Sequence, residues 1–388
     1  MDSEQKITHK IEFPKEFFWG AATAAYQVEG GIENNDWAQA AREGRVPICG
    51  KATNHFELFE KDFDLAKELG HNSHRFSIEW SRIEPIEGKF DLEAIEHYKQ
   101  VLKALRVRGI TPFVTLWHFT LPTWFSNQGG FSHKKGPEIF ARYCEFVAEK
   151  LQGEMKYIIT INEPLVWASA GYLKANWPPF RMNPFSFLKI ISQLIKAHNL
   201  AFKKIKAISS EYQIGVAKHN IYFFSNNYFW NKGQAGFMSW FWNRRFLDGI
   251  QDNQDFIGLN FYFTKRFGRK IKTLQSDMGW DIFPEGLFHC LLELKRYNKP
   301  VIVTENGVAD KADLLRASFI RDSVSFVKKA MDEGVDVRGY LYWSLLDNYE
   351  WSFGFTERFG LIDVDHQTLR REIRPSALIY KEIILTGL

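Results

Sequence analysis

The sequence predicts an α/β protein built as one (β/α)8 barrel that takes up residues 1–388 as a single domain. Short runs of β-branched and aromatic residues alternate with longer stretches of helical periodicity, and the short runs number eight. Eight parallel strands, each followed by a covering helix, close into the TIM-barrel architecture. The expected strands are Phe17–Ala24, His74–Trp80, Ile110–His118, Tyr157–Glu163, Ile214–Asn220, Phe256–Tyr262, Val301–Asn306 and Gly339–Leu346.

Amphipathic helices are expected between these runs. Phe56–Leu69 places Phe and Leu at helical spacing, and Pro137–Leu151 opens with a proline suited to the first helical turn. The stretch Tyr222–Gln254 fits neither pattern. An open doubly wound sheet is the alternative architecture, but no Gly-x-Gly-x-x-Gly motif follows the first strand. The expected helices are Phe56–Leu69, Leu92–Val107, Pro137–Leu151, Phe187–Ile208, Ala312–Met331 and Pro375–Leu385.

Composition favours a globular chain with a large core and argues against nucleic-acid binding. Hydrophobic residues make up 45% of the chain, and the formal net charge is only +4, with acidic and basic residues interspersed. The longest basic cluster, Lys265–Lys272, is better explained as a solvated loop than as an anion-binding patch. The 13 Trp residues are suggestive of sugar binding, because indole faces pack well against apolar C–H surfaces.

The chain is expected to be cytoplasmic. Residues 1–12, expected to be an N-terminal extension, contain no apolar run of the kind that a signal peptide needs. No stretch approaches the roughly 20 apolar residues that span a bilayer. The three cysteines, Cys49, Cys144 and Cys290, form no Cys-x-x-Cys pair, which argues against a disulfide framework or zinc site and for a reducing compartment. The oligomeric state stays open.

Two glutamates fall at the carboxyl ends of expected strands, where barrels of this kind carry catalytic groups. Glu163 ends the fourth strand and precedes a proline, and Glu305 lies near the end of the seventh, before Asn-Gly. Glycosidic cleavage requires such a pair, one carboxylic acid and one carboxylate. Ion pairs at the barrel rim are the alternative explanation. Arg75, within the second strand, would need a carboxylate partner across the barrel.

Six segments, in the same order, resemble those of glycoside hydrolase family 1, the β-glucosidase and β-galactosidase family. The similarity runs from about Phe13 to the C-terminus, which is nearly the whole chain. Each segment alone is moderately specific, and the six in order are very specific. The segments are FPKEFFWGAATAAYQVEG, RFSIEWSRIEP, LWHFTLPTW, TINEP, VTENG and YWSLLDNYEWSFGFTERFGLIDVD.

The resemblance implies a retaining exo-β-glycosidase that works without a metal or cofactor. Glu163 would be the acid/base, and Glu305 would be the nucleophile that forms a covalent glycosyl-enzyme. Arg75 and Tyr262 would hold Glu305 and favour its ionised form, with Asn260 as a further supporting residue. The residues that the resemblance implies in sugar binding are Gln27, His118, Asn162, Trp343, Glu350, Trp351 and Phe359.

The resemblance also implies a small β-glycoside or oligosaccharide substrate with an unphosphorylated sugar, and no nucleic-acid or membrane partner. Glu350 stands where relatives that act on 6-phosphoglycosides carry a serine, and a carboxylate there would repel phosphate. Glu163 stands where the thioglucosidases of the family carry Gln. Glucose, galactose and fucose stay open as the terminal sugar, and transglycosylation stays open beside hydrolysis. A sugar-binding barrel without turnover is the alternative from a different class.

The chain departs from the family pattern in the loops after the fourth to sixth strands, which are shorter than in most relatives. Glu163 and Glu305 are accordingly closer in sequence than usual. These loops normally wall the leaving-group side of the pocket. The aromatic stretch FFSNNYFWNKGQAGFMSWFWNRRF lies in this region, and it is expected to pack on the barrel exterior, to form a subunit interface or to wall the leaving-group side.

Overall fold

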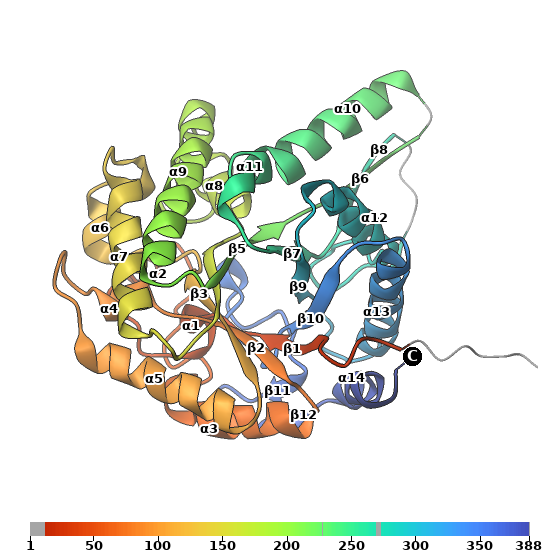
Figure 1. The fold of residues 1–388 in the computed structure, drawn as a ribbon, viewed down its shortest axis with the longest axis horizontal. Coiled ribbons are helices and arrows are strands. Elements are labelled where there is room, and N and C mark those ends of the chain that lie inside the picture. The colour runs from red at the N-terminus through yellow and green to blue at the C-terminus, as the bar shows by residue number, and fades with distance from the viewer. Residues whose placement is uncertain (1–11, 227, 269–272, 388) are drawn as a thin grey trace, which may run out of the picture.

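A closed barrel of eight parallel strands forms the centre of the protein (Figure 1). The computed structural model describes residues 12–226, 228–268 and 273–387. Around the barrel the strands follow the order β1-β10-β9-β7-β5-β4-β3-β2. The eight strands expected from the sequence are therefore confirmed, as is the (β/α)8 barrel. The bounds of the barrel strands are β1 Phe18–Ala22, β2 Ser73–Ser77, β3 Thr111–Trp117, β4 Tyr157–Asn162, β5 Gln213–His219, β7 Ile257–Phe261, β9 Val301–Asn306 and β10 Val337–Trp343.

Strand ends differ from the sequence expectation by a few residues. β2 ends at Ser77 rather than at Trp80, because the next residues turn into the short helix α4 (Trp80–Ile83). Glu79 is the residue before this helix, and its side chain accepts a hydrogen bond from the backbone N–H of Ser81. Such a cap satisfies a donor that the helix itself leaves free. β10 begins two residues earlier and ends three residues earlier than expected.

Helices surround the barrel, as Figure 1 shows for α3, α5, α7, α9, α12, α13 and α14. The six helices expected from periodicity are confirmed, with ends shifted by a few residues. Capping explains two of the starts: Asp91 accepts from two backbone N–H groups at the start of α5, and Asn183 accepts from Ser186 N at 3.0 Å at the start of α9. The helices are α1 Ala25–Val28, α2 Asp36–Arg42, α3 His55–Glu68, α4 Trp80–Ile83, α5 Leu92–Val107, α6 Thr123–Asn127, α7 Gly136–Lys150, α8 Pro164–Tyr172, α9 Pro184–Ile208, α10 Phe229–Ser239, α11 Arg245–Asp248, α12 Glu285–Leu294, α13 Arg316–Asp332 and α14 Pro375–Thr386.

Apolar side chains fill part of the barrel interior. They form a cluster separate from the larger core that includes the residues between strands and helices. A filled interior makes the barrel a packed core rather than a pore, so that a ligand can enter only at one end. The members of the interior cluster are Phe113, Ile159, Ala217, Phe256, Ile302 and Leu341.

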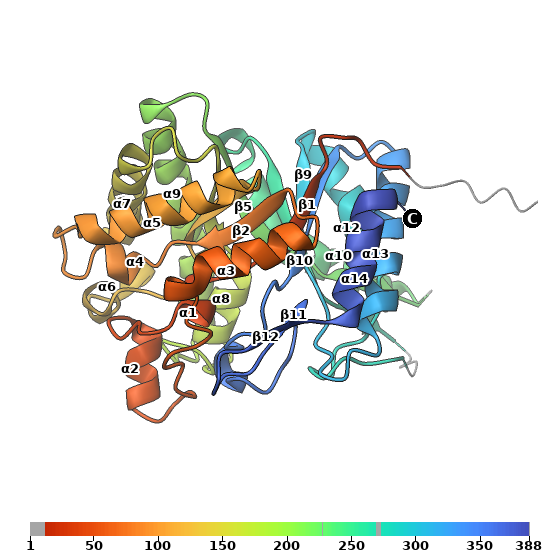
Figure 2. The same cartoon turned by 90° about the horizontal axis from the view of Figure 1, so that it is seen from below.

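The carboxyl ends of the strands are where the barrel departs from regular pairing. Register shifts fall between Ile159 and Asn162 in the β4–β5 pair, and between Leu259 and Asn260 in the β7–β9 pair. Such irregularities re-aim side chains at barrel rims. The segments that follow the strands gather at this end; in Figure 2, α2 and the two-stranded sheet of β11 (Ile362–Val364) and β12 (Arg371–Ile373) lie at the lower end of the view.

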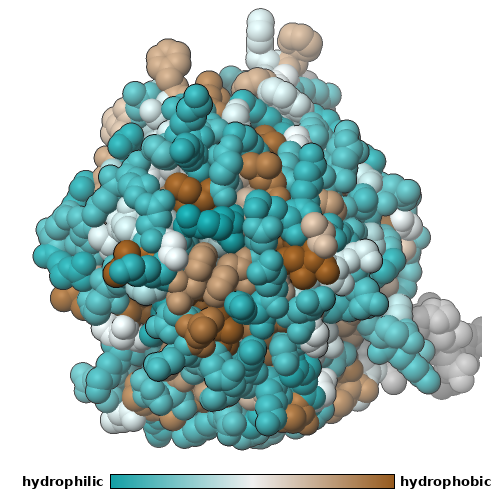
Figure 3. Space-filling view, turned by 60° about the vertical axis from the view of Figure 1, so that its left-hand side comes forward, coloured by the Kyte–Doolittle hydropathy of each residue, from teal (hydrophilic) through white to brown (hydrophobic). Residues whose placement is uncertain are grey.

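The stretch that the sequence left unassigned forms a helical arm. β6 (Tyr222–Ser225) pairs in parallel with β8 (Thr264–Phe267), and α10 follows β6 and extends away from the barrel (Figure 1). A π-helical turn, Trp240–Arg244, and α11 then lead back to the barrel. Trp230 on α10 is 79% exposed, so this part of the stretch does not pack on the barrel exterior, which was one of the three arrangements expected for it. By contrast, the face shown in Figure 3 is largely hydrophilic, with small hydrophobic patches between polar groups.

The structure bears on the cysteines, on membrane-spanning helices and on two segments that the sequence singled out. Cys49, Cys144 and Cys290 are buried and free. Within the described residues, no helix is both long enough and apolar enough to cross a membrane. The basic cluster 265–272 lies outside the described residues from 269 onward, and so does the expected extension 1–12 apart from Glu12.

Gly307 provides a test of the packing at the carboxyl end. A Cβ atom at this position would lie 1.9 Å from the backbone oxygen of Trp343, so the Gly307→Ala variant must displace one of the two strands. We expect a loss of about 1–3 kcal/mol in the free energy of unfolding. Gly236→Ala is the control, because nothing lies within 4 Å of its Cβ position and alanine favours the α10 helix. Equal thermal midpoints for the two variants would contradict the packing argument.

Candidate active site

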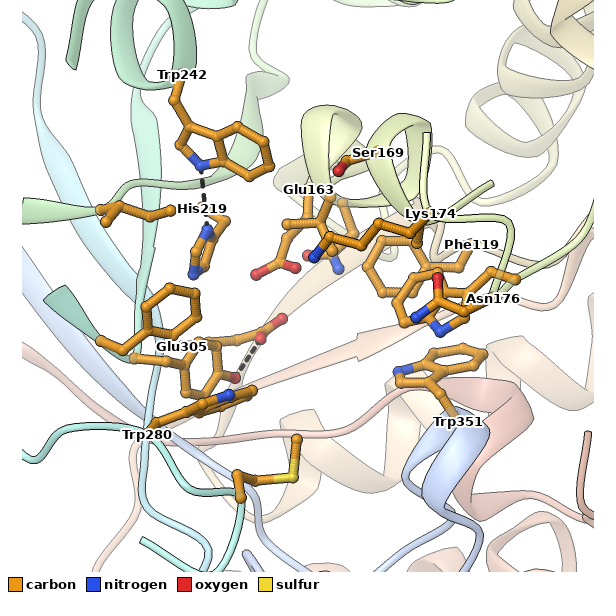
Figure 4. A pocket seen from close by; sticks show the side chains of 18 of the residues that line it. Phe119, Glu163, Ser169, Lys174, Asn176, His219, Trp242, Trp280, Glu305 and Trp351 are labelled. Carbon is orange, nitrogen blue, oxygen red and sulfur yellow. Dashed lines mark hydrogen bonds between the residues drawn. The ribbon is translucent and has the colours of Figure 1, made fainter. Parts of the chain in front are cut away.

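Glu163 and Glu305 line one cavity of about 610 Å³ at the carboxyl end of the barrel, and Figure 4 shows both carboxylates facing it. Both side chains are buried, with exposed fractions of 7% and 3%. Nine of the twelve site residues expected from the sequence line this cavity, and the other three touch it through hydrogen bonds to lining residues. The nine are His118, Asn162, Glu163, Tyr262, Glu305, Trp343, Glu350, Trp351 and Phe359, and the other three are Gln27, Arg75 and Asn260.

Glu305 is held by two charged or polar donors. The fully buried Arg75 donates from Nη1 to Glu305 Oε1, which confirms the expected partner across the barrel. The Tyr262 hydroxyl donates to Glu305 Oε2 at 2.5 Å. The Arg75 Nε atom also donates to Thr115 Oγ1 at 2.9 Å, so the guanidinium plane is fixed from a second side. Both oxygens of the Glu305 carboxylate therefore have a donor.

Among the residues that the structure describes, the Glu163 side chain accepts a hydrogen bond only from a neutral group. Asn260 Nδ2 donates to Glu163 Oε1 at 2.8 Å and approaches Asn162 Oδ1 at 3.2 Å. The orientation of the Asn260 amide is set by Thr304, whose hydroxyl donates to Asn260 Oδ1 at 2.7 Å. Asn260 is therefore an amide held in place beside Glu163, and it brings no charged group to that carboxyl.

The backbone at Glu163 aims its side chain into the cavity. Glu163 has a left-handed conformation, φ 43° and ψ 60°, and it is followed by Pro164 at the start of α8. Residues other than glycine rarely adopt this conformation, and it costs about 1–3 kcal/mol where the surroundings impose it. Here the N–H of Glu163 donates to Ala217 O at 2.7 Å, which ties the strand end to β5.

The two carboxyl groups differ in the charged groups that contact them. Burial and the nearby charge of Glu305 raise the pKa of Glu163. Burial also raises the pKa of Glu305, and the charge of Arg75 and the hydrogen bonds from Tyr262 and Arg75 offset part of that rise. Because Arg75 contacts Glu305 and not Glu163, a single proton shared by the pair is favoured on Glu163. The site thus offers one carboxylic acid and one carboxylate.

His118 is a neutral hydrogen-bonding group of the cavity. Burial and the charge of Arg75 lower its pKa well below the ordinary value. Arg75 Nη2 donates to Asn162 Oδ1 at 2.7 Å, which leaves Asn162 Nδ2 to donate to His118 Nε2 at 3.1 Å. The proton of His118 is then on Nδ1, which has no hydrogen-bond partner among the described residues.

Gln27 and Glu350 form a second polar corner of the site, where Glu350 lines the cavity and Gln27 lies behind it. Gln27 Nε2 donates to Tyr349 O at 2.8 Å and lies 3.3 Å from Glu350 Oε2. The Gln27 Oε1 atom is buried and has no donor partner among the described residues. Burial and the charge of Glu305 raise the pKa of Glu350 to about 8. Trp343 and Trp351 lie nearly parallel to the His118 ring, at interplanar angles of 21° and 15°.

Several aromatic residues of the cavity are not among the twelve expected site residues, and His219, Trp242 and Trp280 are three of them. Trp242 belongs to the aromatic stretch for which a wall of the cavity was one of the three expectations. His219 ends β5 just as His118 follows β3, so the rule that strand ends carry site residues could have found it. Trp242 lies in the π-helical turn, and its Nε1 donates to His219 Nδ1 at 3.4 Å. Trp280 lies in a loop beside Phe263, at a ring distance of 5.2 Å, and no positional rule points to it.

The polar side chains of the site bind one another and are not arranged as a metal site. The Glu305 carboxylate is occupied by Arg75 and Tyr262, and the Asn162 amide by Arg75 and His118. Throughout residues 12–226, 228–268 and 273–387, no group of three or more His, Cys, Asp or Glu side chains is placed to hold a metal ion.

A closed (β/α)8 barrel with a buried carboxylic acid and a buried carboxylate in one cavity has the architecture of a glycoside hydrolase. Comparison with known proteins agrees: the sequence profile of glycosyl hydrolase family 1 matches residues 9–224 and 267–387. The chain belongs to this family and is a glycoside hydrolase of the β-glucosidase type.

Relatives and solved structures match over nearly their whole length. Beta-glucosidase A of Acetivibrio thermocellus is 30% identical, with 97% of this chain and 98% of the relative aligned. A solved beta-glycosidase from Pyrococcus horikoshii is 37% identical with a TM-score of 0.93, covering 97% of this chain and 96% of that one. A Beta-glucosidase from Thermotoga maritima, solved in complex with deoxynojirimycin, is 29% identical with a TM-score of 0.91, covering 97% and 99%.

This chain differs from its relatives in length and in one stretch that the family profile does not match. The alignment with the Acetivibrio thermocellus relative extends over 441 positions, more than the 388 residues of this chain, so the relative has residues that this chain lacks. The family profile leaves out residues 225–266, which include α10, the π-helical turn and α11. Seven of the eight barrel strands and the two glutamates lie in the matched segments, whereas β7, Asn260, Tyr262 and the helical arm lie in the stretch that the profile leaves out.

The Arg75–Glu305 contact can be tested by a double-mutant cycle. We expect Arg75→Met to cost about 3–5 kcal/mol of unfolding free energy at neutral pH, because it leaves a buried carboxylate without its cation. In the Glu305→Gln background the same change strands no charge and should cost less. The control cycle is Arg338→Met with Asp336→Asn, an exposed pair at 2.7 Å that should show little coupling. Additive effects at Arg75 and Glu305 would contradict a direct ionic interaction.

Proposed function

We propose that this protein is a retaining exo-β-glycosidase that removes the non-reducing terminal β-D-glucosyl residue, and also galactosyl or fucosyl residues, from β-glycosides. One observation carries the proposal: the two carboxyl groups share a cavity, and Arg75 contacts Glu305 but not Glu163. A nucleophile must be ionised and a general acid must be protonated, and this asymmetry supplies both states at once.

In the proposed first step, the Glu305 carboxylate attacks the anomeric carbon while Glu163 gives its proton to the glycosidic oxygen. The bond from the anomeric carbon to that oxygen breaks, the alcohol leaves, and a covalent glycosyl-enzyme ester forms. The negative charge of Glu163 that results is tolerated because Glu305 has lost its own charge in forming the ester.

In the second step, Glu163 acts as the base. It takes a proton from a water molecule, whose oxygen attacks the anomeric carbon and displaces Glu305. Two inversions give net retention of configuration. An acceptor alcohol in place of water would give transglycosylation through the same intermediate.

Unpaired polar atoms in and beside the cavity support recognition of sugar hydroxyls. Gln27 Oε1 can accept a hydrogen bond and His118 Nδ1–H can donate one, and neither has a partner among the described residues. Glu350 adds a carboxyl group beside Gln27, which disfavours a phosphorylated sugar at this corner. Trp343 presents its ring as the surface on which the sugar stacks.

We further propose a cytoplasmic location, on the grounds of the sequence and of three buried cysteines that remain free thiols.

Azide rescue tests which glutamate is the nucleophile. Glu305→Gly should abolish turnover of nitrophenyl β-glucosides, and azide should restore release of nitrophenol with an α-glucosyl azide product, because azide attacks from the vacated face. Glu163→Gly is the matched control: azide should there yield the β-glucosyl azide, since Glu305 still forms the intermediate. Product configuration is read by proton NMR. The opposite pair of configurations would reverse the two roles.

The pH profile of kcat/KM tests which group is the acid. The pKa of Glu163 is raised above the ordinary 4.5, so the acid is protonated at neutral pH and activity is lost as the pH rises through that pKa. Glu163→Gln should remove this basic limb for dinitrophenyl β-glucoside, and it should slow substrates with poor leaving groups by roughly 10²–10⁴-fold. Glu350→Gln should keep the limb, although Glu350 also has a raised pKa. Loss of the limb in Glu350→Gln alone would assign it to Glu350.

A further inference from the structure

The part of the helical arm that extends away from the barrel exposes aromatic side chains to the solvent. This arm tip is defined here as residues 222–226 and 228–239, which hold β6 and α10, together with β8, and Figure 1 shows α10 projecting from the barrel. Tyr228, Phe229 and Trp230 follow one another at the start of α10 and are 74%, 78% and 79% exposed. Contiguous exposed apolar side chains of this size mark an interaction surface.

The side chains of α10 are arranged in the reverse of the usual pattern for a surface helix. Residues four apart share a helix face, so Phe229 and the 59% exposed Phe237 lie on one face, with Trp230 beside them. The opposite side holds the buried Ala235 and also Asn231, whose Nδ2 donates to Asn226 Oδ1 at 2.7 Å. A surface helix ordinarily turns its apolar side inward. Here small and polar side chains face the arm, and the aromatic face points outward.

The aromatic face, defined as Phe229, Trp230 and Phe237, is a feature outside the matched family segments. The rings of Phe229 and Trp230 lie 5.6 Å apart, and the Phe237 ring lies 5.9 Å from that of Trp240, which is 40% exposed. All of these residues fall within 225–266, which the family profile leaves out. None of the three residues of the aromatic face lines the cavity that holds Glu163 and Glu305. The aromatic face therefore has a role separate from bond cleavage.

The charged side chains of the arm tip are all basic. Lys232 lies on α10, and Lys265 and Arg266 lie on β8, with Lys265 also lining the cavity, whereas the arm tip contains no Asp or Glu. Glu293 of α12 accepts from the Ser239 hydroxyl at 2.7 Å, but it also pairs with Arg244 at 3.5 Å, so its charge is compensated. The arm tip thus combines exposed Phe and Trp with positive charge, as helices that bind at a lipid–water interface do.

We propose that the arm tip docks on an anionic lipid surface. The aromatic face enters the boundary between headgroups and acyl chains, which Trp and Tyr favour because their rings are apolar and carry a polar edge. The cations contact the negatively charged headgroups, and the cytoplasmic leaflet of a membrane has such a surface. This inference goes beyond the proposed glycosidase function. It departs from the expectation, drawn from the family resemblance, of no membrane partner.

Two other occupants of the aromatic face fit the arm tip less well. A second copy of this chain would bring two basic surfaces together, and like charges oppose such a pairing. Single-stranded nucleic acid is bound in a positively charged groove that follows its backbone. The arm tip is instead a projecting helix whose most exposed side chains are aromatic. A lipid surface satisfies both the aromatic side chains and the cations.

Vesicle flotation tests the inference with the full-length protein. The probes are vesicles of phosphatidylcholine alone and vesicles of phosphatidylcholine mixed with phosphatidylglycerol, and the readout is the partition coefficient of the protein. We expect partitioning to be at least about tenfold stronger on the anionic vesicles and to fall as salt is added, because each cation near the surface contributes to binding. Absence of binding to the anionic vesicles, or equal binding to both kinds, would overturn the inference.

Variants connect the binding to the arm tip. Trp230→Ser should lower partitioning on anionic vesicles about tenfold, and Lys232→Gln should lower it about fivefold. The matched controls lie on α5, which leads into the amino end of β3: Val107→Ser, at a residue 71% exposed, and Lys103→Gln, at an exposed lysine, should bind like the unaltered protein. Thermal midpoints verify that each variant is folded. Equal losses in the α5 variants would overturn the assignment to the arm tip.

The two other occupants have signatures of their own. A dimer in lipid-free solution that Trp230→Ser dissociates, combined with no vesicle binding, would assign the aromatic face to a second copy and overturn the inference. Binding to a DNA fragment without binding to anionic vesicles would overturn it in favour of nucleic acid. Hydrolysis of β-glycosides is measured separately with soluble substrates, so a failure of the proposed function leaves the vesicle result intact.

Discussion

The ion pair between Arg75 and Glu305 is the interaction on which the rest of the site depends. Arg75 is fully buried in β2, and its partner lies 230 positions later in β9. A buried guanidinium without a carboxylate is strongly unfavourable, so the folded barrel has to bring these two strands to one cavity. The same guanidinium also binds Asn162 at the end of β4. Arg75 therefore links strands on different sides of the barrel, and it also stabilises the ionised form of Glu305.

The chemical asymmetry of the site follows from which side chains this arginine reaches. Glu163 and Glu305 are both buried, and burial alone would raise both pKa values. The contact with Arg75 distinguishes them, because only one carboxylate receives a charged donor. The fixed amide of Asn260 completes the arrangement on the other carboxylate without supplying charge. A carboxylic acid and a carboxylate thus coexist in one cavity, with apolar packing inside the barrel and polar groups at its carboxyl end.

The cavity is lined by residues from matched and unmatched parts of the chain. The strands that carry both glutamates match the family profile. Met238, Phe241 and Trp242, which also line the cavity, come from residues that the profile leaves out. Asn260 and Tyr262, which contact the two carboxyl groups, come from the same stretch, so this part of the chain contributes both to the cavity lining and to the immediate surroundings of the glutamates.

The sequence by itself determined the eight strands, the six long helices, the barrel and the polar residues at the strand ends, because hydrophobic periodicity and turn residues are local signals. All twelve expected site residues lie in or beside one cavity, although their chemical roles stay predictions. The tertiary structure alone decided the helical arm at Tyr222–Gln254, whose aromatic residues are partly exposed and partly in the cavity wall. It also decided the pairing of His219 with Trp242 and the unequal surroundings of the two glutamates, since burial and contacts between distant residues have no signature in local sequence.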